Sequence, residues 1–311
     1  MRFLVTGGAG FLGAALANRL AADGHDVIVL DDLSNGETRH LATAVTFHHH
    51  DVDSIPRLWS LLQGVDCVYH LAARVSVAQS ILHPRDYTRV NVGGTVGLME
   101  AMRDTGVRRV VFASSGAIYG HQPRQPVHEE DLPRPDSPYA VSKWAAEQYI
   151  HTIGGLWDIE TVALRIFNAY GPRQSLPLSH APVVPRFLQQ ALTGGSLVIF
   201  GDGGQTRDYV YVADVVEAMV RAATAVNINR QIINIGSGVE TSLNELVNEI
   251  ARATDQAVNR LYNENKSGGV PRLVADIGRA QALLDYRPTT TLPAGLRLTL
   301  QQDERFSHLV G

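Results

Sequence analysis

The sequence has 311 residues, 45% of them hydrophobic, and its 27 basic and 31 acidic side chains give a formal net charge of -4. This mildly acidic balance argues against nucleic acid or an anionic membrane as a partner, because both require a basic surface. No apolar stretch reaches membrane-spanning length, and no cleavable apolar segment follows Met1, so we expect a cytoplasmic protein. The single cysteine, Cys67, excludes an intramolecular disulfide, and we interpret it as a buried strand residue.

The first two-thirds of the chain alternates short β-branched runs with longer helical patterns. This alternation is typical of βαβ units, and the near-continuous apolar character of the runs indicates strands covered on both faces. The sequence therefore predicts an α/β fold with a doubly wound parallel sheet of the Rossmann type. The predicted strands are Arg2–Thr6, Asp26–Leu30, Ala44–Phe47, Cys67–His70, Val110–Ala113 and Glu160–Ile166.

The regular alternation of strand and helix patterns ends after Gly171. A loop rich in Pro, Ser and His runs to Ala181, and helical and strand patterns then return at irregular spacing, which predicts a smaller C-terminal α/β lobe. Tyr209–Ala225 and Gln231–Gly236 form a strand, a helix and a strand that we expect to rejoin the main sheet. The predicted main domain is 1–170 with about 207–240, and the predicted lobe is 171–206 with 241–311.

A glycine-rich loop, Gly7–Gly13, directly follows the first strand and leads into a helix. In this context glycines let the backbone approach a pyrophosphate, which the helix N-terminus stabilises. Asp31 and Asp32, about twenty residues further on, end the second strand, where a carboxylate binds the adenosine ribose and repels a 2′-phosphate. We therefore predict NAD rather than NADP, with adenine contacts at Asp51 and Val52. The alternative is a turn that needs glycine and two solvated aspartates, and the strand context disfavours it.

The triple His48-His49-His50 raises the question of a metal site. Alternate side chains of a strand point to opposite faces, and the sequence shows no further ligand cluster nearby. We expect a strand end with exposed imidazoles and no metal.

A tyrosine and a lysine share one face of a predicted helix. Ser137 is the expected N-cap and Pro138 the first helical residue, so Tyr139 and Lys143 lie one turn apart. A neighbouring ammonium and a positive nicotinamide ring lower the pKa of a tyrosine below its usual value of about 10. Such a phenolate can accept the proton of a substrate hydroxyl.

Two serines, Ser114 and Ser115, close the fifth strand at the carboxyl edge of the sheet, where ligands of doubly wound folds bind. A hydroxyl there can hold the same substrate oxygen as Tyr139, and we favour Ser115. Taken separately, the tyrosine–lysine pair indicates a packed aromatic beside a solvated neighbour, and the serines indicate a turn. Their joint occurrence after a dinucleotide loop favours an active site.

Several motifs follow one another in a fixed order along the whole chain. They are Thr6-Gly-Gly-Ala-Gly-Phe-Leu-Gly13, Asp31-Asp-Leu-Ser-Asn-Gly36, His70-Leu-Ala-Ala73, Asn91-Val-Gly-Gly-Thr95, Ala113-Ser-Ser-Gly-Ala-Ile-Tyr-Gly120, Tyr139-Ala-Val-Ser-Lys143, Leu164-Arg-Ile-Phe-Asn-Ala-Tyr-Gly-Pro-Arg173 and Gly201-Asp-Gly-Gly-Gln-Thr-Arg-Asp-Tyr-Val-Tyr211. With them the chain resembles the extended short-chain dehydrogenase/reductases, in the NAD-dependent epimerase/dehydratase branch. The resemblance implies NAD as cofactor and a UDP-sugar as substrate.

The resemblance also implies roles for individual residues, with Tyr139 as base, Lys143 holding the nicotinamide ribose and Ser115 holding the reacting hydroxyl. The implied cofactor contacts are Gly7, Gly10, Phe11, Leu12, Gly13, Asp31, Asp32, Asn35, Asp51, Val52, Leu71, Ala72, Ala73, Asn91, Tyr139 and Lys143. The implied substrate contacts are Ser115, Asn168, Val184, Phe200, Arg207, Lys266, Arg272 and Leu273. Asn168 and Arg207 would contact the diphosphate, and Phe200 would line the uracil pocket.

The residues after Ser115 bear on the reaction. Dehydratases of this family carry an acidic pair there and decarboxylases a glutamate, whereas this chain has Gly116 and Ala117, which leaves C4 epimerisation of UDP-glucose and UDP-galactose. Asn168 resembles the enzymes of neutral sugars, while Leu273, smaller than the tyrosine of strict glucose enzymes, leaves UDP-GlcNAc open. UDP-glucuronate and other nucleotide sugars remain alternatives, as does a non-catalytic NAD-binding regulator.

One segment departs from the family pattern. Where relatives have arginine, any residue, glycine and aspartate, this chain has Lys266-Ser-Gly-Gly269, so a bidentate phosphate clamp is lost, with Arg272 as a candidate to compensate. Relatives commonly form homodimers through a four-helix bundle, which the helices near Pro84–Thr105 and Pro138–Thr152 are long enough to build.

Overall fold

The predicted apolar runs form a parallel sheet in the computed structural model, which describes residues 1–177, 181–265 and 269–308. Within these residues the sheet has seven strands in the order β10-β6-β5-β4-β1-β2-β3, and all neighbours run parallel. The strands are β1 (Arg2–Thr6), β2 (Asp26–Asp31), β3 (Thr46–His49), β4 (Cys67–His70), β5 (Arg109–Ser115), β6 (Glu160–Ile166) and β10 (Gln231–Ile235). The predicted doubly wound sheet is confirmed.

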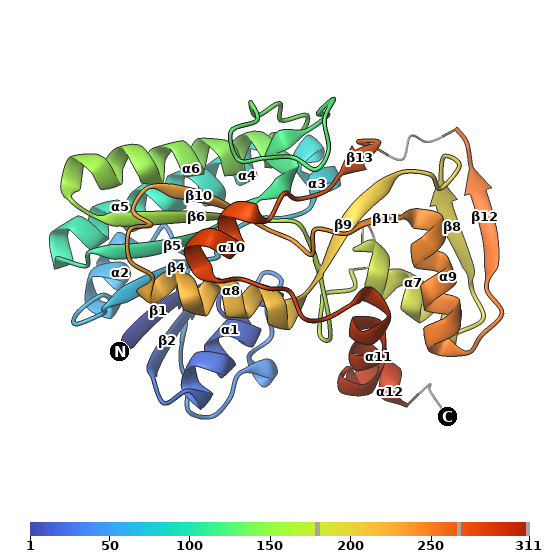
Figure 1. Ribbon diagram of the computed structural model, residues 1–311. Helices are drawn as coiled ribbons and strands as arrows, with labels where there is room; N and C mark the ends of the chain where they lie inside the picture. The colour runs from blue at the N-terminus through green and yellow to red at the C-terminus, as the bar shows by residue number, and fades with distance from the viewer. Residues whose placement is uncertain (178–180, 266–268, 309–311) are drawn as a thin grey trace.

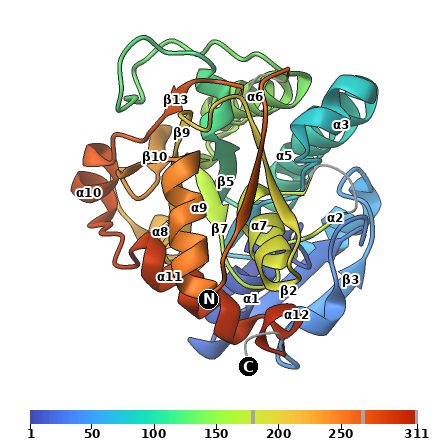
Figure 2. The same cartoon turned by 90° about the vertical axis from the view of Figure 1, so that its right-hand side faces the viewer.

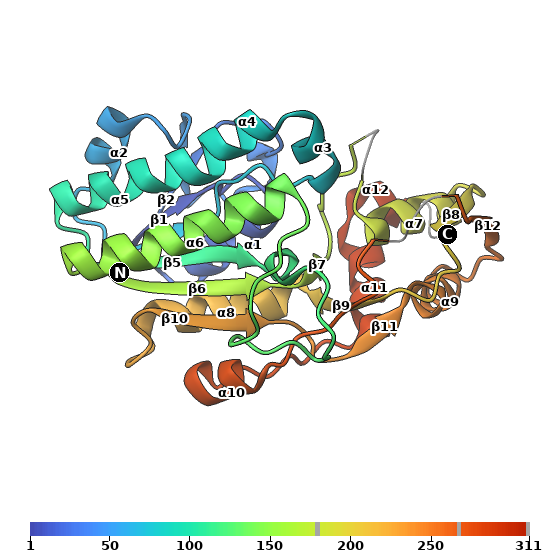
Figure 3. The ribbon, with the colours of Figure 1, turned by 90° about the horizontal axis from the view of Figure 1, so that it is seen from above.

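Helices cover both faces of the sheet (Figures 1 and 3). On one face lie α1 (Phe11–Ala22) and α8 (Val212–Thr224), and on the other lie α2 (Ile55–Leu61), α5 (Gly94–Thr105) and α6 (Pro138–Trp157). Along β1, Phe3 and Val5 join the first hydrophobic cluster and Leu4 joins the second. Because successive strand residues face opposite sides, both layers require apolar residues, which explains the continuous runs.

Two expected boundaries need correction. The third strand begins at Thr46 rather than at Ala44, because the chain makes a turn first, with the Val45 N–H donating to the Ala42 carbonyl. The expected helix Pro84–Thr105 consists of α4 (Pro84–Tyr87), a π-helical turn at Thr88–Gly93 and α5. Before it lies α3 (Val77–Leu82), and short 3-10 turns occupy Thr38–His40 and Gly116–Tyr119.

The smaller lobe lies beyond the carboxyl ends of the main strands (Figure 3). Its strands are β7 (Asn168–Tyr170), β8 (Ser196–Phe200), β9 (Thr206–Tyr211), β11 (Glu240–Ser242), β12 (Asn259–Asn263) and β13 (Arg272–Leu273). Its helices are α7 (Val183–Leu192), α9 (Leu243–Thr254), α11 (Leu292–Gln302) and α12 (Glu304–Ser307). Figure 2 looks at the molecule from the side of this lobe, where α7 and α9 pack together.

The strand that starts the predicted segment Tyr209–Ala225 does not rejoin the main sheet. Only β10 does so, beside β6, and β9 pairs instead with β7, β11 and β13. The reason is that β10 occupies the edge position next to β6. The chain leaves the main sheet directly after β6, and the following strand, β7, pairs with β9. Helix α10 (Gly278–Leu284) returns to pack on β10 and α8. The domain boundaries stay a prediction.

No helix in the described part of the chain is long and apolar enough to cross a membrane. Cys67 is fully buried in β4, as predicted.

A capping box starts α9. The Ser242 hydroxyl accepts from the Glu245 N–H at 3.1 Å, and the Glu245 carboxylate accepts from the Ser242 N–H at 2.7 Å. We expect Ser242→Ala to lower the free energy of unfolding by about 1 kcal/mol, since it leaves a helix N–H without its acceptor. Urea denaturation followed by circular dichroism measures this loss. Ser242→Asp keeps an acceptor and serves as control; an unchanged midpoint for Ser242→Ala would contradict the prediction.

Candidate active site

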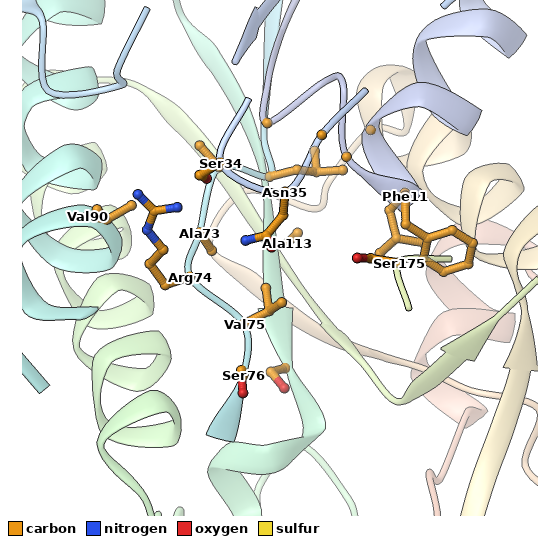
Figure 4. Close-up of a pocket in the computed structure, with 18 of the residues that line it drawn as sticks. Phe11, Ser34, Asn35, Ala73, Arg74, Val75, Ser76, Val90, Ala113 and Ser175 are labelled. Carbon is orange, nitrogen blue, oxygen red and sulfur yellow. The ribbon is translucent and has the colours of Figure 1, made fainter. Parts of the chain in front are cut away.

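The carboxyl edge of the main sheet opens into a cavity of about 660 Å³. Figure 4 shows Arg74 and Val90 on one side of it and Phe11 and Ser175 on the other, with Asn35 between them. Most of the predicted cofactor and catalytic residues line this cavity. They are Gly7, Gly10, Phe11, Leu12, Gly13, Asp31, Asp32, Asn35, Asp51, Val52, Leu71, Ala72, Ala73, Ser115, Tyr139 and Lys143.

The glycine-rich loop forms a cradle that side chains would fill. Gly7 has φ +70°, and a Cβ there would lie 2.6 Å from the backbone nitrogen of Ala72, while a Cβ at Gly13 would collide with the Gly7 carbonyl oxygen. Gly10 is the N-cap of α1, and the first turn of this helix carries no acidic residue. The first N–H groups of a helix have no partner within it and favour an anion. These features fit the pyrophosphate of a dinucleotide.

The two aspartates after β2 have different partners. Asp31 is buried, and its carboxylate accepts from the backbone N–H groups of Ala9 at 2.9 Å and Leu33 at 2.8 Å. Burial raises the pKa of Asp31, although the bonds from Leu33 and Ala9 oppose this. Asp31 thus ties the glycine loop to β2, whereas Asp32 faces Ser34 and Arg74 at the cavity wall. The ribose contact stays a prediction for both.

Helix α6 presents the predicted base to the cavity. As predicted, Ser137 caps the helix by accepting from the Ala140 N–H at 3.2 Å, and Pro138 is its first residue. Burial raises the pKa of Tyr139, and a hydrogen bond with Ser115 opposes this only in part. The expected lowering of this pKa is therefore not present in the protein chain by itself, because desolvation outweighs the bond to Ser115.

Lys143 lies one turn after Tyr139 and is 3% exposed. Its ammonium lies 4.2 Å from the ring centroid of Phe112, a cation–π contact with the strand that leads to Ser115. Burial lowers the pKa of Lys143 to about 7, and the carboxylate of Glu147 acts in the opposite direction. The charge of this lysine is therefore sensitive to what occupies the cavity.

A buried ion pair joins the catalytic helix α6 to strand β6. Glu147 accepts from the Arg165 guanidinium at 2.7 and 3.1 Å and from the Ser114 hydroxyl at 2.7 Å. Arg165 also donates to the Tyr119 hydroxyl at 2.9 Å, which in turn donates to Asn234 at 2.7 Å. The Ser114 hydroxyl is thereby engaged by Glu147, whereas Ser115 acts to lower the pKa of Tyr139. This arrangement supports the choice of the second serine of the pair.

Asn91 does not line the cavity, although it was expected to contact the cofactor. Its amide oxygen accepts from the Arg74 N–H at 2.7 Å, and its amide nitrogen donates to the Arg74 carbonyl at 3.0 Å and to Ser142 at 2.9 Å. Asn91 therefore fixes the backbone that follows β4 and joins it to α6.

Most predicted substrate contacts lie in the smaller lobe, away from the cavity walls. Val184 is buried in the core on α7, and Phe200 ends β8. Arg207 on β9 is paired in register with Leu273 on β13 and donates to the carbonyls of Thr206 and Val270 at 2.7 and 2.6 Å. Leu273 packs into a buried cluster that includes Tyr119 and Phe167. Of the predicted substrate contacts that the structure describes, only Ser115 and Asn168 line the cavity.

Of the segment that departs from the family pattern, only Gly269 lies among the described residues. Arg272, the candidate to compensate, makes a bidentate ion pair with Glu240 at 2.6 and 2.7 Å. It would have to leave this carboxylate to reach a diphosphate. The predicted contact Lys266 lies outside the described residues.

Several cavity residues were not found from the sequence. Arg74 directly follows the Leu71–Ala73 motif, and this position at the carboxyl edge is a signal that would have identified it. Gln174 is brought in by contacts with residues about 130 positions away, since Asp303 accepts from the Arg173 N–H at 2.7 Å and Arg305 donates to the Gln174 carbonyl at 2.8 Å. No local sequence signal reports such contacts. The further lining residues include Ser34, His50, Val75, Ser76, Val90, Ser175 and Pro177.

Among the residues that the structure describes, no group of three or more His, Cys, Asp or Glu side chains is arranged to hold a metal ion. Of the histidine triple, His48 and His49 belong to β3, and His50 lines the cavity.

Comparisons with known proteins agree on one family. The model of the NAD dependent epimerase/dehydratase family matches residues 3–236. A UDP-glucose 4-epimerase of Mycolicibacterium smegmatis is 40% identical over 97% of this chain and 98% of its own length. A Thermotoga maritima UDP-glucose 4-epimerase structure with UDP-glucose aligns with TM-score 0.92 and 35% identity, covering 96% and 97% of the two chains. A Methanobrevibacter ruminantium UDP-N-acetylglucosamine 4-epimerase aligns with TM-score 0.91 and 32% identity, covering 96% of each.

The low pKa of Lys143 predicts a pH-dependent stability of the NAD-free protein. Between about pH 7 and the usual lysine pKa, the unfolded chain binds a proton that the folded chain does not, so stability rises with pH. Relative to Lys143→Met, we expect wild-type protein to gain up to about 1.4 kcal/mol per pH unit between pH 7 and 9. Urea unfolding at each pH measures this difference. Lys143→Arg, which stays charged throughout, should lack the slope, and a pH-independent difference would refute the assignment.

Proposed function

Since this chain belongs to the NAD-dependent epimerase/dehydratase family, we propose that it inverts C4 of a UDP-hexose and thereby interconverts UDP-glucose and UDP-galactose. The chain is an NAD-using isomerase, and the reaction passes through a transient 4-keto sugar. The observation that carries this proposal is that Ser115, Tyr139 and Lys143 line the same cavity, with Lys143 one turn after Tyr139 on α6. A regulator that only bound NAD would have no use for this arrangement.

The residues after Ser115 support epimerisation over elimination. Gly116 and Ala117 carry no ionisable group, and a Cβ at Gly116 would lie 3.1 Å from the ring of Phe167. A dehydratase needs an acid for the leaving hydroxyl and a base for the proton at C5. The carboxylates that line the cavity are those of Asp31, Asp32 and Asp51. They lie at the ends of β2 and β3, three and four strand positions away from β5.

The glycine cradle, Asp31, Asp32 and Lys143 are the residues that would hold NAD. NAD, when bound, accepts the hydride from C4 of the sugar and returns it. Tyr139 accepts the O4 proton while Ser115 holds the same oxygen, and Tyr139 gives the proton back at the end. Burial raises the pKa of Tyr139 above its ordinary value of about 10, and positive charge next to it in the cavity would lower this pKa and favour its action as a base.

Inversion requires the 4-keto hexose to present its other face, so the nucleotide must be held firmly and the sugar loosely. We assign the nucleotide end to the smaller lobe, where Phe200 lies at the end of β8 and Arg207 on β9. Asn168 on β7 joins this lobe to the cavity. We assign Val184 and Leu273 to the uridine and sugar ends of the substrate. Lys266 and Arg272 complete the proposed substrate contacts.

The identity of the sugar rests on two positions. Asn168 lines the cavity and favours a neutral hexose over a glucuronate, because an amide offers no positive charge to a carboxylate. Leu273 is buried, and its small side chain leaves UDP-GlcNAc as the alternative substrate. A cytoplasmic location stays a prediction.

We further propose a homodimer that forms through α5 and α6, which lie side by side on one face (Figure 3). Val141 and Tyr149 on α6 and Ile81 and Leu82 on α3 are exposed large hydrophobic residues. A groove along α5 is lined by Val92, Gly93, Val96, Gly97, Glu100 and Tyr149, among others. Two such faces packed together would bury this apolar surface in a four-helix bundle.

Substrate and mechanism are tested together. We expect wild-type protein to equilibrate UDP-galactose with UDP-glucose without added reductant, and Tyr139→Phe to slow this by about a hundredfold or more, since it removes the general base. Nuclear magnetic resonance of the product mixture measures both. Tyr262→Phe, on the exposed β12, is the matched control and should leave the rate unchanged. Parallel incubations with UDP-GlcNAc and UDP-glucuronate identify the sugar, and no product from any of the three substrates would overturn the proposal.

A charged substitution in the proposed interface tests the dimer. Tyr149→Glu should shift the protein from dimer to monomer in sedimentation velocity, because a carboxylate in a helix bundle interface loses its hydration. Tyr262→Glu places the same charge on an exposed tyrosine of the other lobe and should remain dimeric. A monomeric wild type, or a dimeric Tyr149→Glu variant, contradicts this assembly.

A further inference from the structure

The buried ammonium of Lys143 lies over an aromatic ring that is not among the residues lining the cavity. Lys143 Nζ is 4.2 Å from the ring centroid of Phe112, and Phe112 is 1% exposed. In the described part of the chain, this ammonium takes part in no hydrogen bond or ion pair. The carboxylate of Glu147 is engaged by Arg165 and Ser114 instead. The ring of Phe112 is therefore the group that contacts this charge directly.

A cation in this position needs such a contact, because burial removes the water that would otherwise solvate it. Burial lowers the pKa of Lys143 to about 7, and the carboxylate of Glu147 acts in the opposite direction. The face of an aromatic ring carries negative charge density, and its attraction for an ammonium increases when water is excluded. Phe112 and Glu147 therefore both favour the charged form of Lys143. Positive charge next to Tyr139 would lower the pKa of that tyrosine, so the proposed reaction benefits from a charged lysine.

The main sheet fixes the position of the ring. Phe112 on β5 is paired in register with His70 on β4, and the centroids of their rings lie 5.6 Å apart with an interplanar angle of 31°. Two positions after Phe112 on β5, the Ser114 hydroxyl donates to Glu147 on α6. Because alternate strand residues share a face, Phe112 is also directed toward α6, the helix that carries Lys143. Phe112 accordingly packs in the second hydrophobic cluster, on the face that α6 covers.

The hydrogen bonds of His70, next to this ring, hold its imidazole in the neutral form. The Thr95 hydroxyl donates to the Asn91 carbonyl at 2.6 Å, so it accepts from Nε2 of His70 at 2.8 Å. Nδ1 of His70 then accepts from the Thr6 hydroxyl at 2.8 Å. Burial lowers the pKa of His70 to about 3, and the charge of Lys143 acts in the same direction. His70 therefore does not compete as a cation with Lys143 for the aromatic ring.

We propose that Phe112 is a positioning residue for the proposed reaction, whose ring face holds the ammonium of Lys143 at the cavity wall and keeps it charged. Phe112 does not line the cavity, so it acts through Lys143. This inference deepens the proposed function and rests on it, because Lys143 is the residue assigned to the nicotinamide ribose beside Tyr139. It adds that a hydrocarbon ring in the sheet, as well as the carboxylate of Glu147, sets the charge of the active-site lysine.

The chain has only two lysines, Lys143 and Lys266, so isotope-labelled lysine gives two sets of side-chain signals in the nuclear magnetic resonance spectrum of the full-length protein. Lys266→Arg assigns them. In nucleotide-free protein we expect the ring of Phe112 to shift the methylene protons of Lys143 upfield. Trifluorophenylalanine in place of Phe112 keeps the ring but withdraws charge from its face, and it should lower the titration midpoint of Lys143 by about one pH unit. Phe112→Leu should lower the midpoint as well and abolish the upfield shift.

The midpoint reports Lys143 rather than its neighbours. The other titratable or charged groups around it are Tyr139 and Glu147 on α6, Tyr87 on α4, His70 on β4 and Arg165 on β6. The pKa of His70 is about 3, and burial raises the pKa values of both tyrosines. Glu147 is paired with Arg165, and both side chains are almost completely buried.

Phe3→Leu is the matched control, since Phe3 is also 1% exposed in the main sheet but belongs to the hydrophobic cluster on the opposite face. It should leave the midpoint unchanged. An unchanged midpoint in the trifluorinated protein would overturn the inference, and so would an equal shift in Phe3→Leu or a wild-type spectrum without an upfield-shifted lysine signal.

The role in the reaction is tested on NAD-loaded protein. The kcat of the trifluorinated protein relative to wild type should fall as the pH rises from about 6 to 8, because a larger share of its lysine is neutral. A pH-independent ratio would reject this role. A shifted midpoint in a protein that epimerises no UDP-sugar would reject the proposed function alone, and an unshifted midpoint in an active epimerase would reject this inference alone.

Discussion

The buried ion pair between Glu147 and Arg165 is the constraint on which the active site depends. Each member is almost completely buried, so neither tolerates the loss of the other, because an unpaired charge in the interior costs several kcal/mol. Their bidentate geometry fixes α6 against β6 and sets the rotation of the helix about its axis. Tyr139 and Lys143 lie two turns and one turn before Glu147 and therefore face the cavity.

The same pair organises the strand opposite the helix. The Ser114 hydroxyl donates to Glu147, and since successive strand residues alternate in direction, Ser115 is left to meet Tyr139. A buried network at the cavity wall thus decides which serine takes part in chemistry. The rigid part of the site is built on strands and one helix of the main sheet, and the parts expected to hold the nucleotide come from the smaller lobe.

Desolvation drives the two central titratable groups toward their neutral forms. It raises the pKa of Tyr139 and lowers that of Lys143, with Ser115 and Glu147 acting against these shifts. Neither group is set for catalysis by the chain alone, since a general base must release its own proton first. A ligand that brings positive charge into the cavity and excludes water from it changes the pKa values of both Tyr139 and Lys143. Chemistry is thereby coupled to occupancy of the cofactor cavity.

Features that depend on near neighbours in the chain could be predicted from the amino-acid residues alone. Near-continuous apolar runs between helical patterns predicted the strands of the main sheet, and the Gly7–Gly13 loop and the Ser137 cap were recognisable from adjacent residues. Three further features could not be predicted in this way and follow from the folded arrangement: the pairing of β9 with β7, the bond between Asp32 and Arg74, and the bond from Arg305 to Gln174. These contacts join residues tens to more than a hundred positions apart, and they follow from which strands become neighbours, a property that no local pattern encodes.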